Sequence, residues 1–172
     1  MSECQSFAPV AAKDSRLLIL GSMPGVRSLQ LGQYYGHPHN RFWPLMAQLL
    51  GYQAVPAGYQ QKLQMLLANR IALWDVLGYC QREGSLDAAI TGEQPNDLAG
   101  FLRQHPQLTV ICCNGGKAAA AFKKYSKTID LSGITVYNLP STSPANARWR
   151  LPQLAAAWQI VQTTADQANK NP

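Results

Sequence analysis

The fold of this chain is decided by a pattern that first occurs in Leu17-Leu18-Ile19-Leu20-Gly21-Ser22-Met23-Pro24-Gly25. Four apolar residues run directly into a turn with two glycines and a proline, as expected for a short buried strand that ends abruptly. The same order of apolar run, turn and helical pattern recurs along the chain. The predicted strands are residues 17–20, 71–74, 109–113 and 134–139.

Helical patterns lie between and after these strands, at residues 42–50, 60–68, 97–104, 117–125 and 153–167. Strands that alternate with helices are typical of a parallel sheet covered on both faces. The sequence therefore predicts the α/β class, as a three-layer α/β/α sandwich around a central four-stranded parallel sheet. The 172 residues suffice for a single domain, with its core at about residues 15–165. The weakly patterned ends, 1–13 and 168–172, are expected to be disordered.

The chain is basic, with 15 Lys and Arg against 9 Asp and Glu, a formal charge of +6 and a pI of about 9.3. A positive field favours a polyanionic partner such as nucleic acid, although solubility alone also accounts for it. The first 13 residues lack the basic start and apolar run of a signal peptide, and no apolar segment approaches membrane-spanning length. We therefore expect a soluble cytoplasmic protein without a membrane partner.

Side chains that commonly bind metals are few and poorly spaced. The cysteines are Cys4, Cys80, Cys112 and Cys113, with no C-x-x-C pair. Two of them are adjacent in a predicted buried strand, so reduced structural thiols are expected. His37 and His39 have no third ligand at a suitable spacing. The sequence thus predicts no metal site and no cofactor.

Loops that leave the carboxyl ends of parallel strands meet at one edge of the sheet. Here they carry residues 21–25, Asp75, 114–117 and 140–148. The glycines of the first turn let backbone amides approach a ligand, although a plain turn is the alternative. The last loop suits phosphate binding, with helix capping as its alternative. Its candidate DNA-contacting residues are Ser141, Thr142, Ser143, Asn146 and Arg148.

The most unusual stretch is Gly36-His37-Pro38-His39-Asn40-Arg41-Phe42-Trp43-Pro44. It places a carboxamide, two imidazoles, a cation and two large aromatics in one loop, a mixture that core packing does not require. The structural alternative is that Asn40 caps a helix, Phe42 and Trp43 enter the core, and the histidines have no role. After the third strand, Asn114-Gly115-Gly116-Lys117 lacks the Walker pattern, and Asn114 is predicted to be a helix N-cap.

Three motifs, in this order, resemble the uracil-DNA glycosylase superfamily. They are Gly21-Ser22-Met23-Pro24-Gly25, His37-Pro38-His39-Asn40-Arg41-Phe42-Trp43 and Leu139-Pro140-Ser141-Thr142-Ser143-Pro144. The resemblance spans about residues 17–160 and is strongest to the hypoxanthine-DNA (deoxyinosine) glycosylase branch and the mismatch-specific uracil-DNA glycosylases. It implies a monomeric repair enzyme that flips a deaminated base out of DNA and hydrolyses its glycosidic bond without metal, cluster or organic cofactor. Hypoxanthine is the first expected base and uracil the second.

The same resemblance assigns roles to residues. The mismatch-specific branch has a water-positioning asparagine where this chain has Met23, whereas the hypoxanthine-directed branch lacks a polar group there and has its essential asparagine at the position of Asn40. Asn40 is therefore the implied catalytic residue, and strong activity on uracil is not expected. Phe42 matches the aromatic that stacks on the flipped base. The implied base-binding residues are Gly21, Ser22, Met23, Phe42 and Asp75.

The chemistry of these side chains agrees with those roles. A neutral carboxamide can orient the water that attacks the sugar as the base leaves, so Asn40 would contribute through proximity rather than proton abstraction. An ionised Asp75 only accepts, so it can bond the ring N–H of hypoxanthine or uracil but not the bare ring nitrogen of adenine. Capping, or an ion pair with an arginine, is the structural alternative for Asp75. No lysine lies in a motif for Schiff-base chemistry, so the expected product is an abasic site with an intact backbone.

Two other functions remain open. One is a non-catalytic protein that binds nucleotides or damaged DNA on the same fold and lacks a water-positioning group at Met23. The other is a small-molecule nucleotide hydrolase, which the lack of metal-ligand carboxylate pairs in the sequence disfavours.

Overall fold

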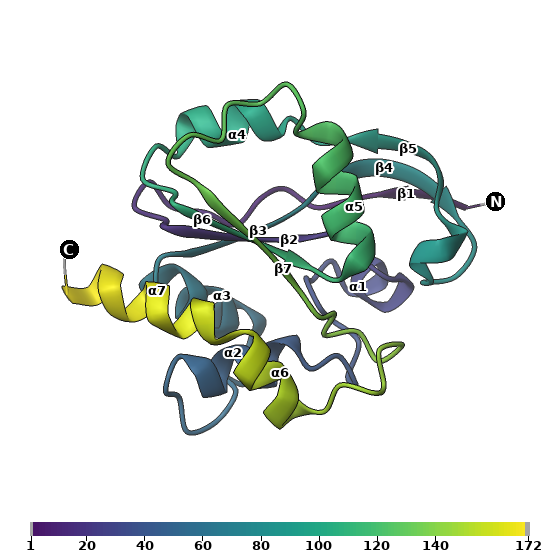
Figure 1. Ribbon diagram of the computed structural model, residues 1–172. Coiled ribbons are helices and arrows are strands. Elements are labelled where there is room, and N and C mark those ends of the chain that lie inside the picture. The colour runs from purple at the N-terminus through teal and green to yellow at the C-terminus, as the bar shows by residue number, and fades with distance from the viewer. Residues whose placement is uncertain (1, 171–172) are drawn as a thin grey trace.

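The computed structural model describes residues 2–170 and contains the predicted central sheet. Its four parallel strands are β2 (Leu17–Gly21), β3 (Ile71–Asp75), β6 (Val110–Asn114) and β7 (Thr135–Leu139). They are joined in the order β3-β2-β6-β7 (Figure 1). Gly21 lies opposite Asp75 in the register, and Asn114 lies opposite Leu139. The carboxyl ends of the four strands therefore meet at one edge of the sheet.

Helices cover both faces of this sheet, which confirms the three-layer α/β/α sandwich (Figure 1). One face carries α2 (Phe42–Leu49), α3 (Tyr59–Ala68), α6 (Leu151–Ala157) and α7 (Gln159–Lys170), and the other carries α4 (Leu98–Gln104) and α5 (Gly116–Tyr125). Successive strand residues point to opposite faces, so Leu17 packs in the first core cluster and Leu18 in the second. This double burial explains why β2, β3 and β6 are nearly continuous apolar runs, whereas β7 buries only Leu139.

A second sheet, which the sequence analysis did not predict, extends the molecule at one end. It is antiparallel and contains β1 (Ser2–Gln5), β4 (Leu77–Arg82) and β5 (Thr91–Pro95) in the order β1-β4-β5. Only Val76 separates the end of β3 from the start of β4, so the second sheet starts beside the carboxyl edge of the central sheet. Its strands have few buried residues, and β1 buries only Cys4. Their apolar pattern was therefore too weak to recognise.

The expected disorder of the two chain ends is wrong for most of their residues. Residues 2–5 form β1, and Val10 exchanges two backbone hydrogen bonds with Leu73, at 2.9 and 2.8 Å. At the other end α7 continues to Lys170 and buries Ala168. Met1 and residues 171–172 lie outside the described part of the chain. Backbone pairing and helix packing thus hold both ends against the core.

All four cysteines are free and buried, as expected for structural thiols. Burial raises the pKa of Cys112 and of Cys113 to about 12. Neither side chain is therefore a thiolate nucleophile at neutral pH. Within residues 2–170, no helix combines the length and apolar character needed to cross a membrane.

Candidate functional site

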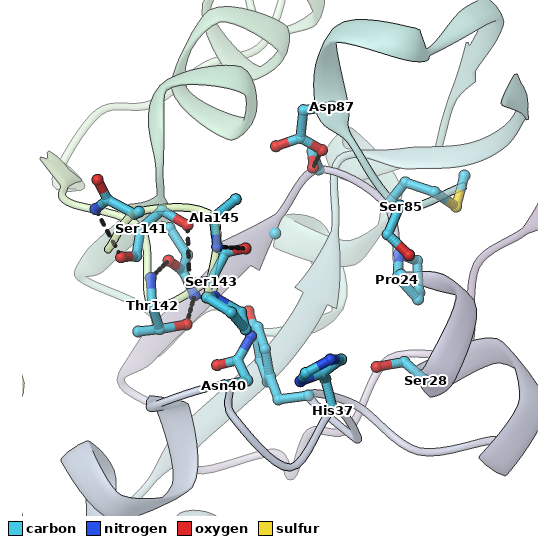
Figure 2. A pocket seen from close by; sticks show the side chains of 18 of the residues that line it. Pro24, Ser28, His37, Asn40, Ser85, Asp87, Ser141, Thr142, Ser143 and Ala145 are labelled. Carbon is cyan, nitrogen blue, oxygen red and sulfur yellow. Dashed lines mark hydrogen bonds between the residues drawn. The ribbon is translucent and has the colours of Figure 1, made fainter. Parts of the chain in front are cut away.

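A pocket of about 680 Å³ lies at the carboxyl edge of the central sheet. Its volume is within the range of small-molecule sites. The loops that were expected to meet at this edge do so, and Figure 2 shows residues 141–145 across the pocket from Ser85 and Asp87. The segment at residues 85–87, between β4 and β5, is a wall that the sequence analysis missed.

The first turn forms the pocket wall nearest the end of β2. A Cβ on Gly21 would lie 2.5 Å from Oδ1 of Asp75, so only glycine lets that carboxylate lie against the strand end. The Ser22 hydroxyl donates to Asp87 Oδ1 at 2.7 Å, which ties the turn to the opposite wall. Met23 is buried in the core cluster beneath α5 and also lines the pocket. The turn therefore contributes to the pocket mainly through its shape and its backbone groups, and little through reactive side chains.

Asp75 ends β3 in the pocket wall with only 4% of its surface exposed. Its Oδ2 is buried and finds no hydrogen-bond partner among residues 2–170. Burial and then the negative Asp87 raise the pKa of Asp75, the positive Arg82 opposes the shift, and the result is a pKa of about 7. The structural alternatives for Asp75 were an ion pair with an arginine or capping. Within residues 2–170 no arginine forms an ion pair with its carboxylate, and Asp75 caps no helix. A carboxyl with a free acceptor therefore faces the pocket.

Asn114, at the end of β6, does not cap the helix as predicted. The N-cap of α5 is Gly115, and Asn114 bonds across to the last loop instead. Its Oδ1 accepts from Thr142 N–H at 3.0 Å, and its Nδ2 donates to Thr142 Oγ1 at 3.1 Å and to Tyr35 Oη at 3.2 Å. Thr142 is fully buried. The prediction that Thr142 contacts the DNA backbone does not fit this position, because the residue is buried and its hydroxyl accepts from Asn114.

Tyr34, Tyr35 and Trp149 line the pocket and Phe42 does not, so the placement of Phe42 in the pocket is wrong. Phe42 is 0% exposed and is not a lining residue. Tyr35 stacks on it, with ring centroids 3.9 Å apart and an interplanar angle of 23°. Trp43 also enters the core, as the structural alternative stated. Tyr35 has φ of 54°, a left-handed conformation that is rare for such a bulky residue and concentrates at functional positions.

Asn40 is not the N-cap of α2, which is Arg41, but its side chain bonds the first residue of that helix. Its Oδ1 accepts from Phe42 N–H at 2.9 Å, at the start of α2. It also lines the pocket, next to His37 in the close-up of Figure 2. Its Nδ2 makes no hydrogen bond within residues 2–170 and so keeps its donors for a ligand. His37 Nδ1 accepts from His39 N–H at 3.0 Å, which orders this loop.

Arg41 holds the loop at residues 141–146, a role that the sequence did not indicate. Its Nη2 donates to the carbonyl oxygens of Ser143 at 2.6 Å and Asn146 at 3.1 Å. Asn146 Nδ2 in turn donates to Ser141 O at 2.9 Å. The Asn146 side chain thus uses one N–H within the loop, and its contact with DNA stays a prediction.

The hydroxyls of Ser141 and Ser143 accept backbone N–H groups of their own loop, at 3.1 and 3.2 Å. Their own hydrogens are left to donate outward. Arg148 is exposed, and no hydrogen bond or ion pair of its side chain is seen within the described chain. Two apolar side chains also stand at the pocket rim, Leu86 with 62% and Trp149 with 37% exposed. Across residues 2–170, no three His, Cys, Asp or Glu side chains are grouped to hold a metal.

Comparison with known proteins assigns the chain to a family. A family model described as the uracil DNA glycosylase superfamily matches residues 8–163. The chain belongs to this superfamily. The family expected from the three motifs is thereby confirmed.

The relatives in this superfamily include two proteins named hypoxanthine DNA glycosylase. The one from Methanosarcina acetivorans is 39% identical over 145 residues, covering 84% of this chain and 89% of its own. The one from Methanosarcina barkeri is 37% identical over 144 residues, with the same coverage. A solution NMR structure from M. acetivorans, described as a candidate uracil DNA glycosylase, superposes with a TM-score of 0.78 at 35% identity. It covers 94% of this chain and 99% of its own.

Proposed function

We propose that this protein is a DNA glycosylase that extrudes a deaminated base from DNA and hydrolyses its bond to deoxyribose. Hypoxanthine is the proposed first substrate and uracil the second, and the product is an abasic site with an intact backbone. The observation that carries the proposal is the meeting of Asn40, the Tyr35 ring and the Asp75 carboxyl in one pocket. The two relatives named hypoxanthine DNA glycosylase support the choice of base.

Tyr35 is the residue proposed to receive the flipped base. A base that leaves the duplex loses its stacking, and an aromatic face in the pocket offsets part of that loss. The Tyr35 ring is held against Phe42 on one side, and its hydroxyl accepts from Asn114. A ring fixed in this way costs little entropy when it stacks on a ligand. Phe42 thus supports the stacking face and does not itself provide it.

Asn40 is the proposed catalytic residue. As the base departs with the bonding electrons, positive charge develops on the sugar, so the attacking water needs orientation more than a strong base. The Asn40 Oδ1 already accepts from Phe42 N–H, which fixes the carboxamide plane. An oxygen lone pair can accept from the water while the backbone bond is kept, because a carbonyl oxygen has two. Met23 supplies no such group, so we place no chemistry there.

Asp75 is proposed to read the base edge in its ionised form. Hypoxanthine and uracil each present a ring N–H that the free Oδ2 can accept, whereas adenine presents a bare nitrogen. Discrimination by a buried polar group is strong, because the wrong partner leaves that group unpaired. The backbone of the flipped nucleotide would be held by Ser141, Ser143 and Arg148, whose donors face outward.

The proposal is tested by incubating the protein with oligonucleotides that carry one deoxyinosine, deoxyuridine or deoxyxanthosine. Alkali then cleaves at any abasic site. We expect strand breaks at deoxyinosine first, only after alkali, and in the presence of a chelator. If no base is released while the oligonucleotides are still bound, the alternative function, a non-catalytic binder of damaged DNA, is correct.

A further inference from the structure

Arg27 is a cation in the pocket wall that the proposed chemistry does not yet use. It is exposed near the start of α1 (Val26–Leu31) and is the one Lys or Arg among the described residues that line the pocket. Within residues 2–170 its side chain forms no ion pair or hydrogen bond, although Asp75 and Asp87 line the same pocket. An exposed arginine on an open surface needs no ligand, but a free guanidinium in the wall of a ligand pocket is a donor for an anion.

His37 comes from a loop that is bonded to α1 beside Arg27. Gly36 N–H donates to Ser28 Oγ at 2.9 Å, and Arg27 and His37 are the next residues to this pair along the chain. A Cβ on Gly36 would lie 3.4 Å from Ser28 Cα, so the two segments approach closely. His37 also lines the pocket, and its ring lies next to Ser28 in Figure 2. The two side chains therefore belong to one wall of the pocket.

A hydrogen bond within the loop determines which ring nitrogen of His37 can donate. Nδ1 accepts from His39 N–H at 3.0 Å, so the hydrogen of the neutral imidazole lies on Nε2. Nε2–H is an uncharged donor, whereas the Arg27 guanidinium always carries a positive charge. This wall thus offers a phosphate two kinds of donor, one that neutralises its charge and one that does not.

This wall lies across the pocket from the loop that is proposed to hold the DNA backbone. Figure 2 shows Ser28 and Ser85 on one side of the pocket and residues 141–145 on the other. A nucleotide within a strand has one phosphate on each side of its sugar. If its base enters between the two walls, each wall meets one phosphate, and the loop at residues 141–148 accounts for only one of the two.

We propose that Arg27, with His37 Nε2–H beside it, binds the second phosphate of the flipped nucleotide, so that the DNA strand crosses the mouth of the pocket from one wall to the other. Two bound phosphates fix the sugar between them and place its glycosidic bond against Asn40. This role of Arg27 rests on the proposed function for the identity of the nucleotide, but the phosphate contact can be measured by binding without release of the base.

The test uses duplexes with one deoxyinosine, in which the phosphate on its 5′ side, on its 3′ side or on neither side is replaced by an uncharged methylphosphonate. Binding is measured in the Asn40→Ala background, which is expected to keep the base attached. We expect Arg27→Ala to weaken binding to the unmodified duplex about tenfold, and to have little further effect once one of the two phosphates is uncharged. Arg148→Ala should behave in the same way toward the other phosphate. Arg103→Ala removes an exposed charge on α4 and is the control, which should couple to neither phosphate.

His37→Ala separates the two donors. It should weaken binding through the same phosphate as Arg27→Ala but leave the salt dependence of affinity near the wild-type value, because a neutral donor displaces no counterion. Arg27→Ala should decrease the slope of log affinity against log salt by about one unit. Both variants should melt near the wild-type temperature, since both side chains are exposed. No effect of Arg27→Ala, an equal effect on all three duplexes, or coupling of Arg27 and Arg148 to the same phosphate would overturn the inference.

A base-release assay on the wild-type protein distinguishes this inference from the proposed function. Release of hypoxanthine without coupling of Arg27 to either phosphate would overturn the phosphate contact alone. Coupling without release of any base would overturn the proposed hydrolysis and leave the phosphate contact in place.

Discussion

The carboxamide of Asn40 has a structural and a chemical task, and substitutions can separate them. Asn40→Ala removes both, and we expect base release to fall about 100-fold or more, because an unoriented water loses its proximity advantage. The variant also loses the bond to Phe42 N–H, at a cost of about 1 kcal/mol in unfolding free energy. DNA binding should change little. Single-turnover rates, binding affinity and a thermal melt measure the three quantities.

Asn40→Asp is the matched control, since its carboxylate keeps the acceptor for Phe42 N–H and keeps the fold stable. It places a negative charge beside the departing base and should also be slow. Wild-type turnover in Asn40→Ala would show that Asn40 only shapes the start of α2.

Substitutions of the stacked residues Tyr35 and Phe42 are expected to have different effects, one on base binding and the other on fold stability. Tyr35→Ala should weaken binding of the flipped base by about 1–3 kcal/mol, the usual scale for a lost stacking face. Phe42→Ala should instead destabilise the fold by about 3–5 kcal/mol, because its ring is fully buried. Tyr35→Phe keeps the ring and should bind nearly as wild type. Each variant is measured by a thermal melt and by titration with deoxyinosine DNA. A loss of affinity per folded molecule in Phe42→Ala would contradict this assignment.

Asp75 makes both activity and stability depend on pH. Its pKa is raised from 3.8 to about 7, so the folded protein holds the proton more tightly than the unfolded chain. Its contribution to stability is therefore greatest below the unfolded value and falls as pH rises through about 7. Base release should run the other way and increase through the same pH range, because the ionised form accepts the N–H.

Asp75→Asn checks both trends, because the amide oxygen can still accept but does not titrate. We expect the melting temperature of this variant to exceed that of wild type at pH 8 and to approach it at pH 5. The rate of base release by this variant should no longer decline as the pH falls below about 7. A wild-type rate that is flat between pH 6 and 8 would exclude Asp75 as the titrating base reader.

Among the elements, the loop at residues 141–146 is held by contacts from distant parts of the chain. The Arg41 side chain binds three of its carbonyls, and Asn114 binds Thr142. Arg41→Lys keeps the charge but replaces the separate Nε and Nη2 donors of a planar guanidinium with one ammonium nitrogen. We expect faster amide hydrogen exchange in this loop and base release about tenfold slower, with the melting temperature nearly unchanged. Exchange that stays at the wild-type rate would show that Asn114 alone fixes the loop.

The central strands β2, β3 and β6 could be predicted because they are buried on both faces and are therefore apolar runs; β7 was predicted although it buries only Leu139. The alternation of these strands with turns and helices predicted that the pocket loops meet at one edge. β4 was missed because its buried residues include a cation, Arg82, which a search for apolar patterns does not count as core. The Asn114 and Thr142 pair joins residues 28 positions apart, and no local pattern encodes that contact. Two adjacent tyrosines in the sequence gave no sign that both line the pocket, Tyr34 with only 3% of its surface exposed.

For the whole molecule, the basic charge and the position of Arg148 set the expected behaviour on DNA. The formal charge of +6 favours association with any duplex. Arg148 is exposed just beyond the pocket loop, which suits a phosphate contact rather than a base contact. Arg148→Ala should then weaken binding to damaged and undamaged duplexes alike, and the slope of log affinity against log salt should decrease by about one unit.

Arg103→Ala, which removes an exposed arginine on α4 outside the pocket, is the control for lost net charge. It should leave the salt slope near the wild-type value. Affinity is measured on both duplexes across a salt series, with a melt of each variant. A loss of stability without a loss of affinity would mean that Arg148 serves the fold. A loss confined to deoxyinosine DNA would place Arg148 at the flipped base, because a phosphate contact cannot distinguish the two duplexes.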